Sequence, residues 1–328
     1  MSTDIQHAKT IVLNWQKSTD SAELAQLPAC FATFTDIGYI WRGVHPFHEQ
    51  NRADSVIEVF YRPFKDAFSA LQRRQDIFFA GQNEIDGFTS VWVASMGHFL
   101  GLFDRPFVGI PPHNKIAMIR YAEFHKVENG QIRETALFID LLHLMAQVGL
   151  TPVPKQTGMH LIQPGPRTHD GLLTEVQDTK EGEATLALIN RMIGDINYGD
   201  YTSPQEELRQ CWHEDMLWWG PTGIGATYTI DRYIDQHQRP FRTQNEGRRF
   251  NGHICRMAEG HYGGFFGWPN LSLKPIGGYL GMPPFQGYAD MRVVDIYRRD
   301  GNKLAENWIF IDLLHFLYMQ GQDILSQI

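Results

Sequence analysis

The sequence has few cysteines, no long apolar run and no long block of charges of one sign. Its three cysteines, Cys30, Cys211 and Cys255, form no CxxC pair, so the sequence carries no zinc signature and we expect reduced packing residues. No window approaches the roughly 18 uninterrupted apolar residues of a membrane span, and the polar N-terminus lacks the apolar core of a secretion signal. We therefore expect a cytoplasmic protein without a membrane partner.

The charges are also spread along the chain. Lys and Arg number 29 against 37 Asp and Glu, a net charge of −8 that argues against a nucleic-acid partner and favours a small-molecule substrate. The sequence shows no cluster of three His, Asp or Glu ligands, so we expect no metal. The glycines at 263–267 give no nucleotide-binding fingerprint, because no strand-to-helix unit follows them.

What the sequence does contain is an internal repeat. ENWIFIDLLHFLYMQG at 306–321 repeats ETALFIDLLHLMAQVG at 134–149, and GMPP at 281–284 repeats GIPP at 109–112, at one constant spacing. A repeat this long duplicates a whole domain. We expect domains over residues 1–150 and 184–328, joined by a Pro-rich connector over 151–183. The two halves are expected to face each other through their sheets as an intramolecular pseudo-dimer, and further oligomerisation stays open.

Apolar periodicity predicts an α+β fold in each half. Helical spacing covers 4–17, 21–32 and 52–71 in the first half and 183–197, 204–212 and 229–241 in the second, with Pro63 expected to kink its helix or divide it. Runs rich in β-branched and aromatic residues at 75–81, 87–103, 115–128, 131–142 and 248–313 predict long antiparallel strands. The stretch at 268–277 has no counterpart in the first half and is expected to form a loop near the rim.

Each half carries an acid inside an apolar strand-like run, Asp140 in LFIDLL and Asp312 in IFIDLL. Burying a carboxylate is costly, so these are the candidate catalytic residues. Alternation along a strand places Trp308, Phe310 and Asp312 on one face, and Phe138 with Asp140 on the corresponding face, which predicts a carboxylate in an aromatic-lined space. The alternative is a structural acid that caps a turn or pairs with an arginine.

Four further residues are candidates for the same sites. His98 and His261 could carry protons near neutral pH, or could be hydrogen-bonded core or rim histidines. Arg120 and Arg292 could steer an anionic or enolate-like substrate, or could pair with the aspartates.

The aromatic candidates lie on an earlier strand of each half. The adjacent residues Trp218 and Trp219 could both be core residues, but one of two neighbours on a strand must face the cavity side. We take Trp219, with Trp41 in the first half, as substrate-binding. Glu123 and Asp295 stand three residues after the arginines, hence on the other strand face, where a solvated role is expected.

Both halves resemble the SnoaL-like polyketide cyclase family of the nuclear transport factor 2-like superfamily. The resemblance rests on GHFLGLF and GHYGGFFG, on GIPP and GMPP, on the arginine-containing strands, on the ENGQI and DGNKL hairpins, and on Trp308 followed by Asp312. It implies two cone-shaped domains, each a curved antiparallel sheet wrapped around N-terminal helices. It also implies that the aspartate acts as general acid and base in an aldol condensation without metal or organic cofactor. The sequence departs from the family pattern at His113 and Phe285, which replace a threonine.

These observations predict a cofactor-independent enzyme of the cyclase, isomerase or lyase type that acts on a small carbonyl compound. The alternatives are a non-catalytic small-molecule binding protein and a hydrolase of an epoxide, ester or sugar derivative. We expect the second copy to be more active, because Trp308 would shield Asp312 from water whereas Ala136 leaves Asp140 a wetter pocket.

Overall fold

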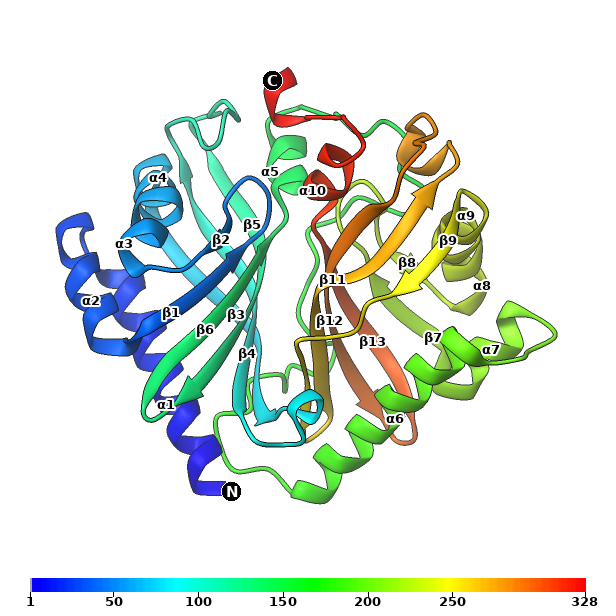
Figure 1. Cartoon of the computed structure of the whole chain (residues 1–328), viewed down its shortest axis with the longest axis horizontal. Coiled ribbons are helices and arrows are strands. Elements are labelled where there is room, and N and C mark those ends of the chain that lie inside the picture. Colours follow the sequence, from blue (N-terminus) through cyan, green and yellow to red (C-terminus); the bar gives the residue numbers. More distant parts are fainter. Residues whose placement is uncertain (1) are drawn as a thin grey trace. The chain divides into compact units, whose positions relative to one another are not determined.

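The computed structural model describes residues 2–328, which form two compact units (Figure 1). Unit 1 comprises Met1–Leu150, Arg167–Val176 and Asp323–Ile328, and unit 2 comprises Thr151–Pro166 and Gln177–Gln322. The expected connector is therefore not a separate body, because its first part belongs to unit 2 and a later part to unit 1. Leu172 of that later part bridges to Phe78.

Unit 1 is a six-stranded sheet with the helices α1 to α4 along one face (Figure 1). The strand order is β2-β1-β6-β5-β4-β3, and β1 runs parallel to β6 while the other pairs are antiparallel, so the sheet is mixed. Its elements are α1 (Ser2–Ser21), α2 (Leu27–Phe34), β1 (Thr35–Gly43), β2 (His48–Gln50), α3 (Ala53–Val56), α4 (Arg62–Ala67), β3 (Phe68–Gln82), β4 (Val91–Phe103), β5 (Ile116–Glu128), β6 (Gln131–Ile139) and α5 (Leu141–Gln147).

Unit 2 repeats this plan with seven strands in the order β10-β11-β12-β13-β7-β8, and β9 pairs with β11. Here β7 is the strand that runs parallel to its neighbour, β13. The elements are α6 (Thr179–Tyr198), α7 (Pro204–Cys211), β7 (Trp212–Trp219), β8 (Thr227–Tyr228), α8 (Ile230–Tyr233), α9 (Arg239–Thr243), β9 (Asn245–Phe250), β10 (Cys255–Glu259), β11 (Tyr262–Pro275), β12 (Ala289–Asp300), β13 (Lys303–Ile311) and α10 (Leu313–Tyr318). The predicted α+β class with curled sheets is confirmed.

Strand register bears out the duplication within each sheet. Glu123 pairs with Leu137 across β5 and β6, and the residues at the repeat spacing, Asp295 and Ile309, pair across β12 and β13. The same residues of each copy therefore occupy the same places in the two sheets.

A π-helical turn interrupts the third helical segment of each unit, at Ile57–Tyr61 and at Ile234–Gln238. Each is followed by an Arg-Pro pair, at Pro63 and Pro240, that opens the next α-helix. Proline lacks the N–H that an α-helix would use, and the wider turn before Pro63 divides the segment into α3 and α4, which was one of the two outcomes expected from sequence. In unit 1 this third segment ends at Ala67, earlier than expected, because β3 begins at Phe68.

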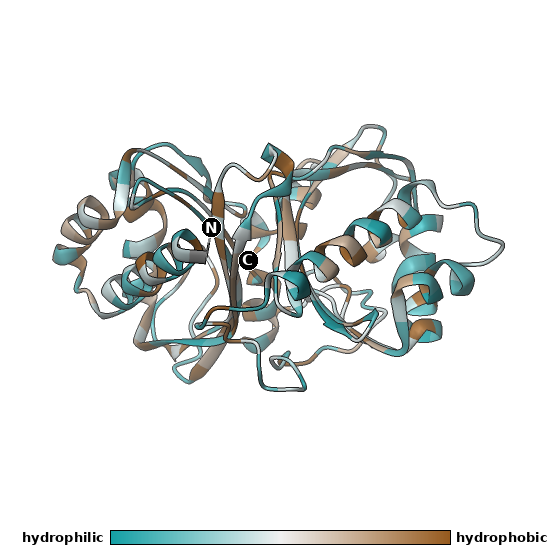
Figure 2. Cartoon of the chain, turned by 90° about the horizontal axis from the view of Figure 1, so that it is seen from below, coloured by the Kyte–Doolittle hydropathy of each residue, from teal (hydrophilic) through white to brown (hydrophobic). Residues whose placement is uncertain are grey.

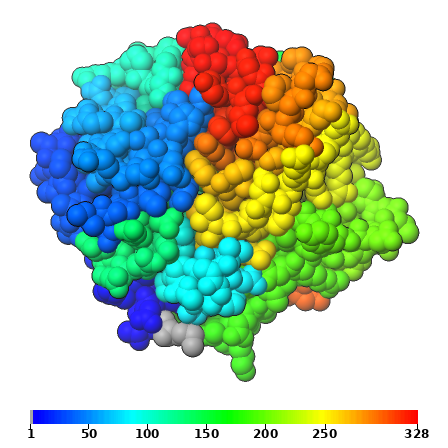
Figure 3. Space-filling view, viewed as in Figure 1, coloured from blue at the N-terminus to red at the C-terminus, as the bar shows by residue number. Residues whose placement is uncertain are grey.

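The expected loop at 268–277 is wrong over most of its length. Residues up to Pro275 continue β11, where Leu271 pairs with Phe250 of β9 and with Met291 of β12. Alternating apolar residues hold this extension in the sheet. Strand β9 lies at the surface, within the segment coloured yellow in Figure 3.

Helices α1 and α6 carry hydrophilic and hydrophobic residues side by side, as helices that cover a sheet do (Figure 2). Strand β13 differs, because every residue from Leu304 to Phe310 is buried. Both of its faces are therefore covered, and apolar alternation cannot indicate which one lines a cavity.

Candidate active site

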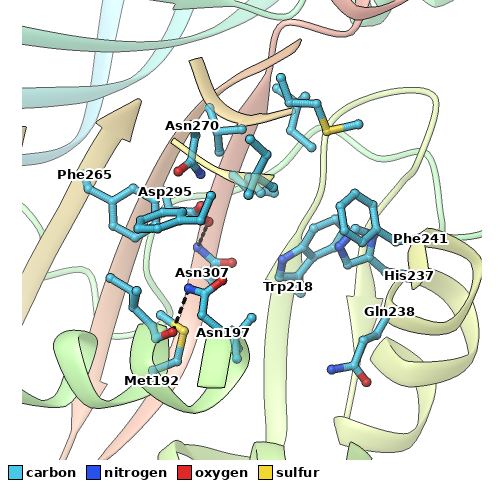
Figure 4. A pocket seen from close by; sticks show the side chains of 18 of the residues that line it. Met192, Asn197, Trp218, His237, Gln238, Phe241, Phe265, Asn270, Asp295 and Asn307 are labelled. Carbon is cyan, nitrogen blue, oxygen red and sulfur yellow. Dashed lines mark hydrogen bonds between the residues drawn. The ribbon is translucent and has the colours of Figure 1, made fainter. Parts of the chain in front are cut away.

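Unit 2 encloses a cavity of about 150 Å³ between its sheet and its helices (Figure 4). Residues of α6, β7, α8, the π-helical turn, α9, β9 and β11 to β13 line it. Most of the wall is apolar or aromatic, including Trp218, Phe241, Phe265, Met291 and Val293. Such a cavity with a few polar groups is typical of a small-molecule site.

The strand face that lines the cavity is not the one expected from sequence. On β13 the lining residues are Asn307, Ile309 and Ile311. Trp308, Phe310 and Asp312 alternate with them, so their predicted projection into the cavity is wrong. The indole Nε1 of Trp308 instead donates a hydrogen bond to the Pro164 carbonyl oxygen at 2.9 Å.

The two aspartates of the repeat cap helices. Asp312 precedes α10 and accepts a hydrogen bond from the His315 backbone N–H at 3.2 Å, and Asp140 precedes α5 and accepts one from His143 at 3.0 Å. Asp312 also pairs with Arg292 at 3.3 Å. The structural alternative, an acid that caps a turn or pairs with an arginine, therefore describes their contacts. Neither aspartate lines the unit 2 cavity, and their catalytic role stays a prediction.

The remaining polar candidates also lie outside the set that lines the unit 2 cavity. His98 Nδ1 lies 3.3 Å from an Asp76 carboxylate oxygen, and Arg120, which is opposite His98 on the next strand, is buried. His261 stands at the turn between β10 and β11, where its half-exposed ring lies 3.1 Å from an Arg299 nitrogen.

The aromatic candidates are packing residues of their units. Phe138, Phe310 and Trp219 are buried, and neither Phe310 nor Trp219 lines the cavity. Trp41 packs in unit 1 with its ring centroid 5.6 Å from that of Phe60. The residue that faces the unit 2 cavity is Trp218, the neighbour of the one chosen.

The acid that does line the cavity is Asp295 of β12, which is only 6% exposed. Its carboxylate accepts a hydrogen bond from the Asn307 side-chain amide at 3.0 Å (Figure 4) and another from the Tyr297 hydroxyl. The expectation that Asp295 is solvated is wrong. Neutral donors therefore hold a carboxylate among apolar walls, where its charge is poorly screened by water.

A histidine lines the wall formed by the π-helical turn. The ring of His237 stacks on that of Trp218 with centroids 4.0 Å apart (Figure 4). Burial, aided by the positive charge of Arg242, lowers the pKa of His237 to about 3, so the imidazole is neutral at pH 7. Within the described residues its Nδ1 has no hydrogen-bond partner. A neutral imidazole can donate or accept one hydrogen bond at each nitrogen according to its tautomer.

Two tyrosines also line the cavity. Burial raises the pKa of Tyr233 and Tyr297, and the negative charge of Asp295 raises both further. Both phenols therefore stay protonated at neutral pH and remain hydrogen-bond donors. The cavity thus combines one carboxylate with several neutral donors, a set that sequence reasoning missed.

The corresponding place in unit 1 is occupied by an ion pair. Glu123 stands where unit 2 has Asp295, and it lies 2.6 Å from the Arg73 guanidinium and 2.9 Å from the Gln16 amide. Burial alone would raise the pKa of Glu123, but Arg73, with His125 and Gln16, lowers it to about 2. This carboxylate is a weak base at neutral pH, so the two copies differ in chemistry at the same strand position.

Among residues 2–328 no group of three His, Cys, Asp or Glu side chains is arranged to hold a metal ion. None of the helices in that range is both long and apolar enough to cross a membrane.

No protein-family model matches the chain, and no curated protein matches it. Solved structures that are similar include a protein of Jannaschia sp. CCS1 named as a SnoaL-like polyketide cyclase, at 17% identity over 43% of this chain and 91% of its own, with a TM-score of 0.33. An NTF2-like protein of Burkholderia thailandensis shows 20% identity over 43% of this chain and 96% of its own, with a TM-score of 0.33. TsrD of Streptomyces laurentii shows 18% identity over 43% and 96%, with a TM-score of 0.35.

Proposed function

We propose that unit 2 is an acid–base enzyme that removes a proton next to the carbonyl group of a small substrate, with Asp295 as the general base. The observation that carries this proposal is the Asp295 carboxylate, which lines an apolar cavity and is held by the Asn307 amide at 3.0 Å. A positioned carboxylate can accept a proton from the carbon beside a carbonyl. Asn307 also donates a hydrogen bond to the Ile296 carbonyl oxygen at 3.1 Å, so its amide is held in place and orients the Asp295 carboxylate.

The neutral donors of the cavity supply the second half of this chemistry. As the proton leaves, negative charge develops on the carbonyl oxygen, and a hydrogen-bond donor at that point lowers the barrier. Tyr233 is a protonated phenol that lines the cavity, and the neutral His237 imidazole lies beside it with ring centroids 5.3 Å apart. Removing one such donor from an enzyme typically lowers the rate by a factor of about 100 or more.

The size of the cavity limits the substrate. A dry apolar cavity of about 150 Å³ accommodates roughly one benzene ring. The enolate formed there can be reprotonated at another carbon, attack a second carbonyl or expel a leaving group, which are isomerase, cyclase and lyase outcomes. All of them begin with the same proton transfer, and none requires a cofactor.

Deuterium exchange tests this first step even while the product is unidentified. Single-ring ketones are incubated in D₂O with the full chain, and deuterium at the carbon beside the carbonyl is followed by NMR. Wild type should accelerate exchange of at least one ketone, and Asp295→Asn should slow it by a factor of about 100 or more.

The matched control is Asp300→Asn, which removes an equal charge at the exposed end of the same strand. It should exchange at the wild-type rate. Equal exchange by wild type and Asp295→Asn would contradict the proposal, and binding without any exchange would favour a non-catalytic binding protein.

A further inference from the structure

Two arginines line the cavity near the exposed strand β9. Arg242 of α9 binds both carboxylate oxygens of Glu207, at 2.8 and 3.1 Å, so its charge has a counter-charge. Arg248 of β9 donates to the Ile196 carbonyl oxygen at 2.9 Å, and in the described part of the chain it forms no ion pair. One positive charge at the cavity thus has only a neutral partner.

The surroundings of Arg248 favour an anion there. Shielding by the cavity wall and the neighbouring Arg242 charge lower the pKa of Arg248 from its ordinary value, and Glu207 opposes this effect. An arginine stays charged at any physiological pH, so Arg248 presents a full positive charge to an anionic group in the cavity.

The cavity is therefore lined by charges of opposite sign, Arg248 on the exposed strand β9 and the buried Asp295 on β12. An anionic group would be attracted to the first and repelled by the second. Apolar side chains of Phe265, Val293 and Ile309 line the same space and suit a ring.

We propose that the substrate is a single-ring carbonyl compound that carries a carboxylate, which Arg248 binds at the cavity mouth while the ring enters and the carbonyl reaches Asp295. This inference rests on the proposed function, because it assigns the ends of the substrate to the base and to the arginine. The planar guanidinium can donate two parallel hydrogen bonds to a carboxylate, and one arginine matches its single charge.

The test compares charged and neutral forms of one ring. The probes are 4-oxocyclohexane-1-carboxylate with its carboxamide, and phenylacetate with phenylacetamide, and calorimetry on the full chain measures the dissociation constants. Each carboxylate should bind about tenfold more tightly than its amide. This factor is at the lower end of what a charge-assisted hydrogen bond contributes to binding, because water screens the exposed Arg248. Arg248→Gln should remove that preference.

Arg249→Gln is the matched control. Arg249 is the next residue of β9 and lies over the Tyr288 ring at 3.8 Å without lining the cavity, so its loss changes the net charge equally and should leave the preference intact. No preference for the carboxylates, or equal weakening by Arg248→Gln and Arg249→Gln, would overturn the inference. A preference for phenyl phosphate over both carboxylates would overturn the choice of carboxylate.

The two proposals fail separately. If Asp295→Asn leaves exchange unchanged while Arg248→Gln abolishes the preference for carboxylates, the carboxylate site stands and the catalytic role fails. If Asp295→Asn abolishes exchange while Arg248→Gln has no effect on binding, the base stands and the assigned substrate class fails.

Discussion

Replacement of His237 by phenylalanine should reduce the acid sensitivity of the protein. The pKa of His237 is about 3 in the folded protein against an ordinary value of 6.5. Between these values the unfolded chain binds more protons than the folded one, so the free energy of unfolding falls as the pH decreases from 6.5 toward 3. At pH 4.5 the loss from this one group is about 2.7 kcal/mol, because each pH unit contributes about 1.4 kcal/mol.

Phenylalanine is a suitable replacement because unit 1 has Phe60 at the same place in its π-helical turn. The variant keeps an aromatic ring to stack on Trp218 and carries no titratable group. Urea unfolding at pH 7.5 and 4.5 gives the free energy of unfolding at each pH. The difference between the two should be smaller in His237→Phe than in wild type by about 2.7 kcal/mol.

A second measurement separates this cause from a general effect on stability. NMR of the histidine ring carbons should show no titration of His237 between pH 7.5 and 4.5 in the folded protein. Titration near pH 6.5, or the same pH dependence of unfolding in both proteins, would show that burial does not keep His237 neutral in the folded protein.

Two further predictions concern buried carboxylates with structural roles, and both are measured by urea unfolding at pH 7. Glu123→Gln should lower the free energy of unfolding by about 3 kcal/mol. The change leaves the Arg73 guanidinium, whose side chain is 8% exposed, with Asp20 as its remaining ion-pair partner. A loss below about 1 kcal/mol would show that the Glu123–Arg73 pair is unimportant for stability. Asp312→Ala should lower the free energy of unfolding by about 1 kcal/mol or more, because it removes the cap of α10 and the ion pair with Arg292. Asp312→Asn can still cap the helix and should lower it less. The reverse order would exclude capping as the main role of Asp312.

The sequence predicted the fold well because the duplication is visible as repeated segments at one constant spacing. Residues Glu123 and Asp295 share a place in the repeat, and the structure gives them equivalent strand partners. The π-helical turns could not be predicted, because the apolar spacing at 52–71 is also that of an α-helix. Only the Arg-Pro pairs at Pro63 and Pro240 hinted at an interruption.

The site was missed for a physical reason. Alternation divides β13 into two faces, but both are buried, so the choice fell on the face that carries the acid Asp312. A signal for the other face was present in RVVDIY, where Asp295 also stands inside an apolar run. The argument that a buried carboxylate is costly applies to that residue equally well. The neutral state of His237 depends on burial in three dimensions and has no mark in the sequence.

The role of Asp295 as the base is best tested by the ratio of deuterium-exchange rates for Asp295→Asn and Asp312→Asn on one ketone that wild type exchanges. Both variants remove one buried carboxylate of unit 2 and preserve side-chain shape. Asp295→Asn should exchange more slowly than Asp312→Asn by a factor of about 100 or more, because Asp295 lines the cavity and Asp312 does not. Loss of exchange in Asp312→Asn with near wild-type exchange in Asp295→Asn would contradict this role of Asp295.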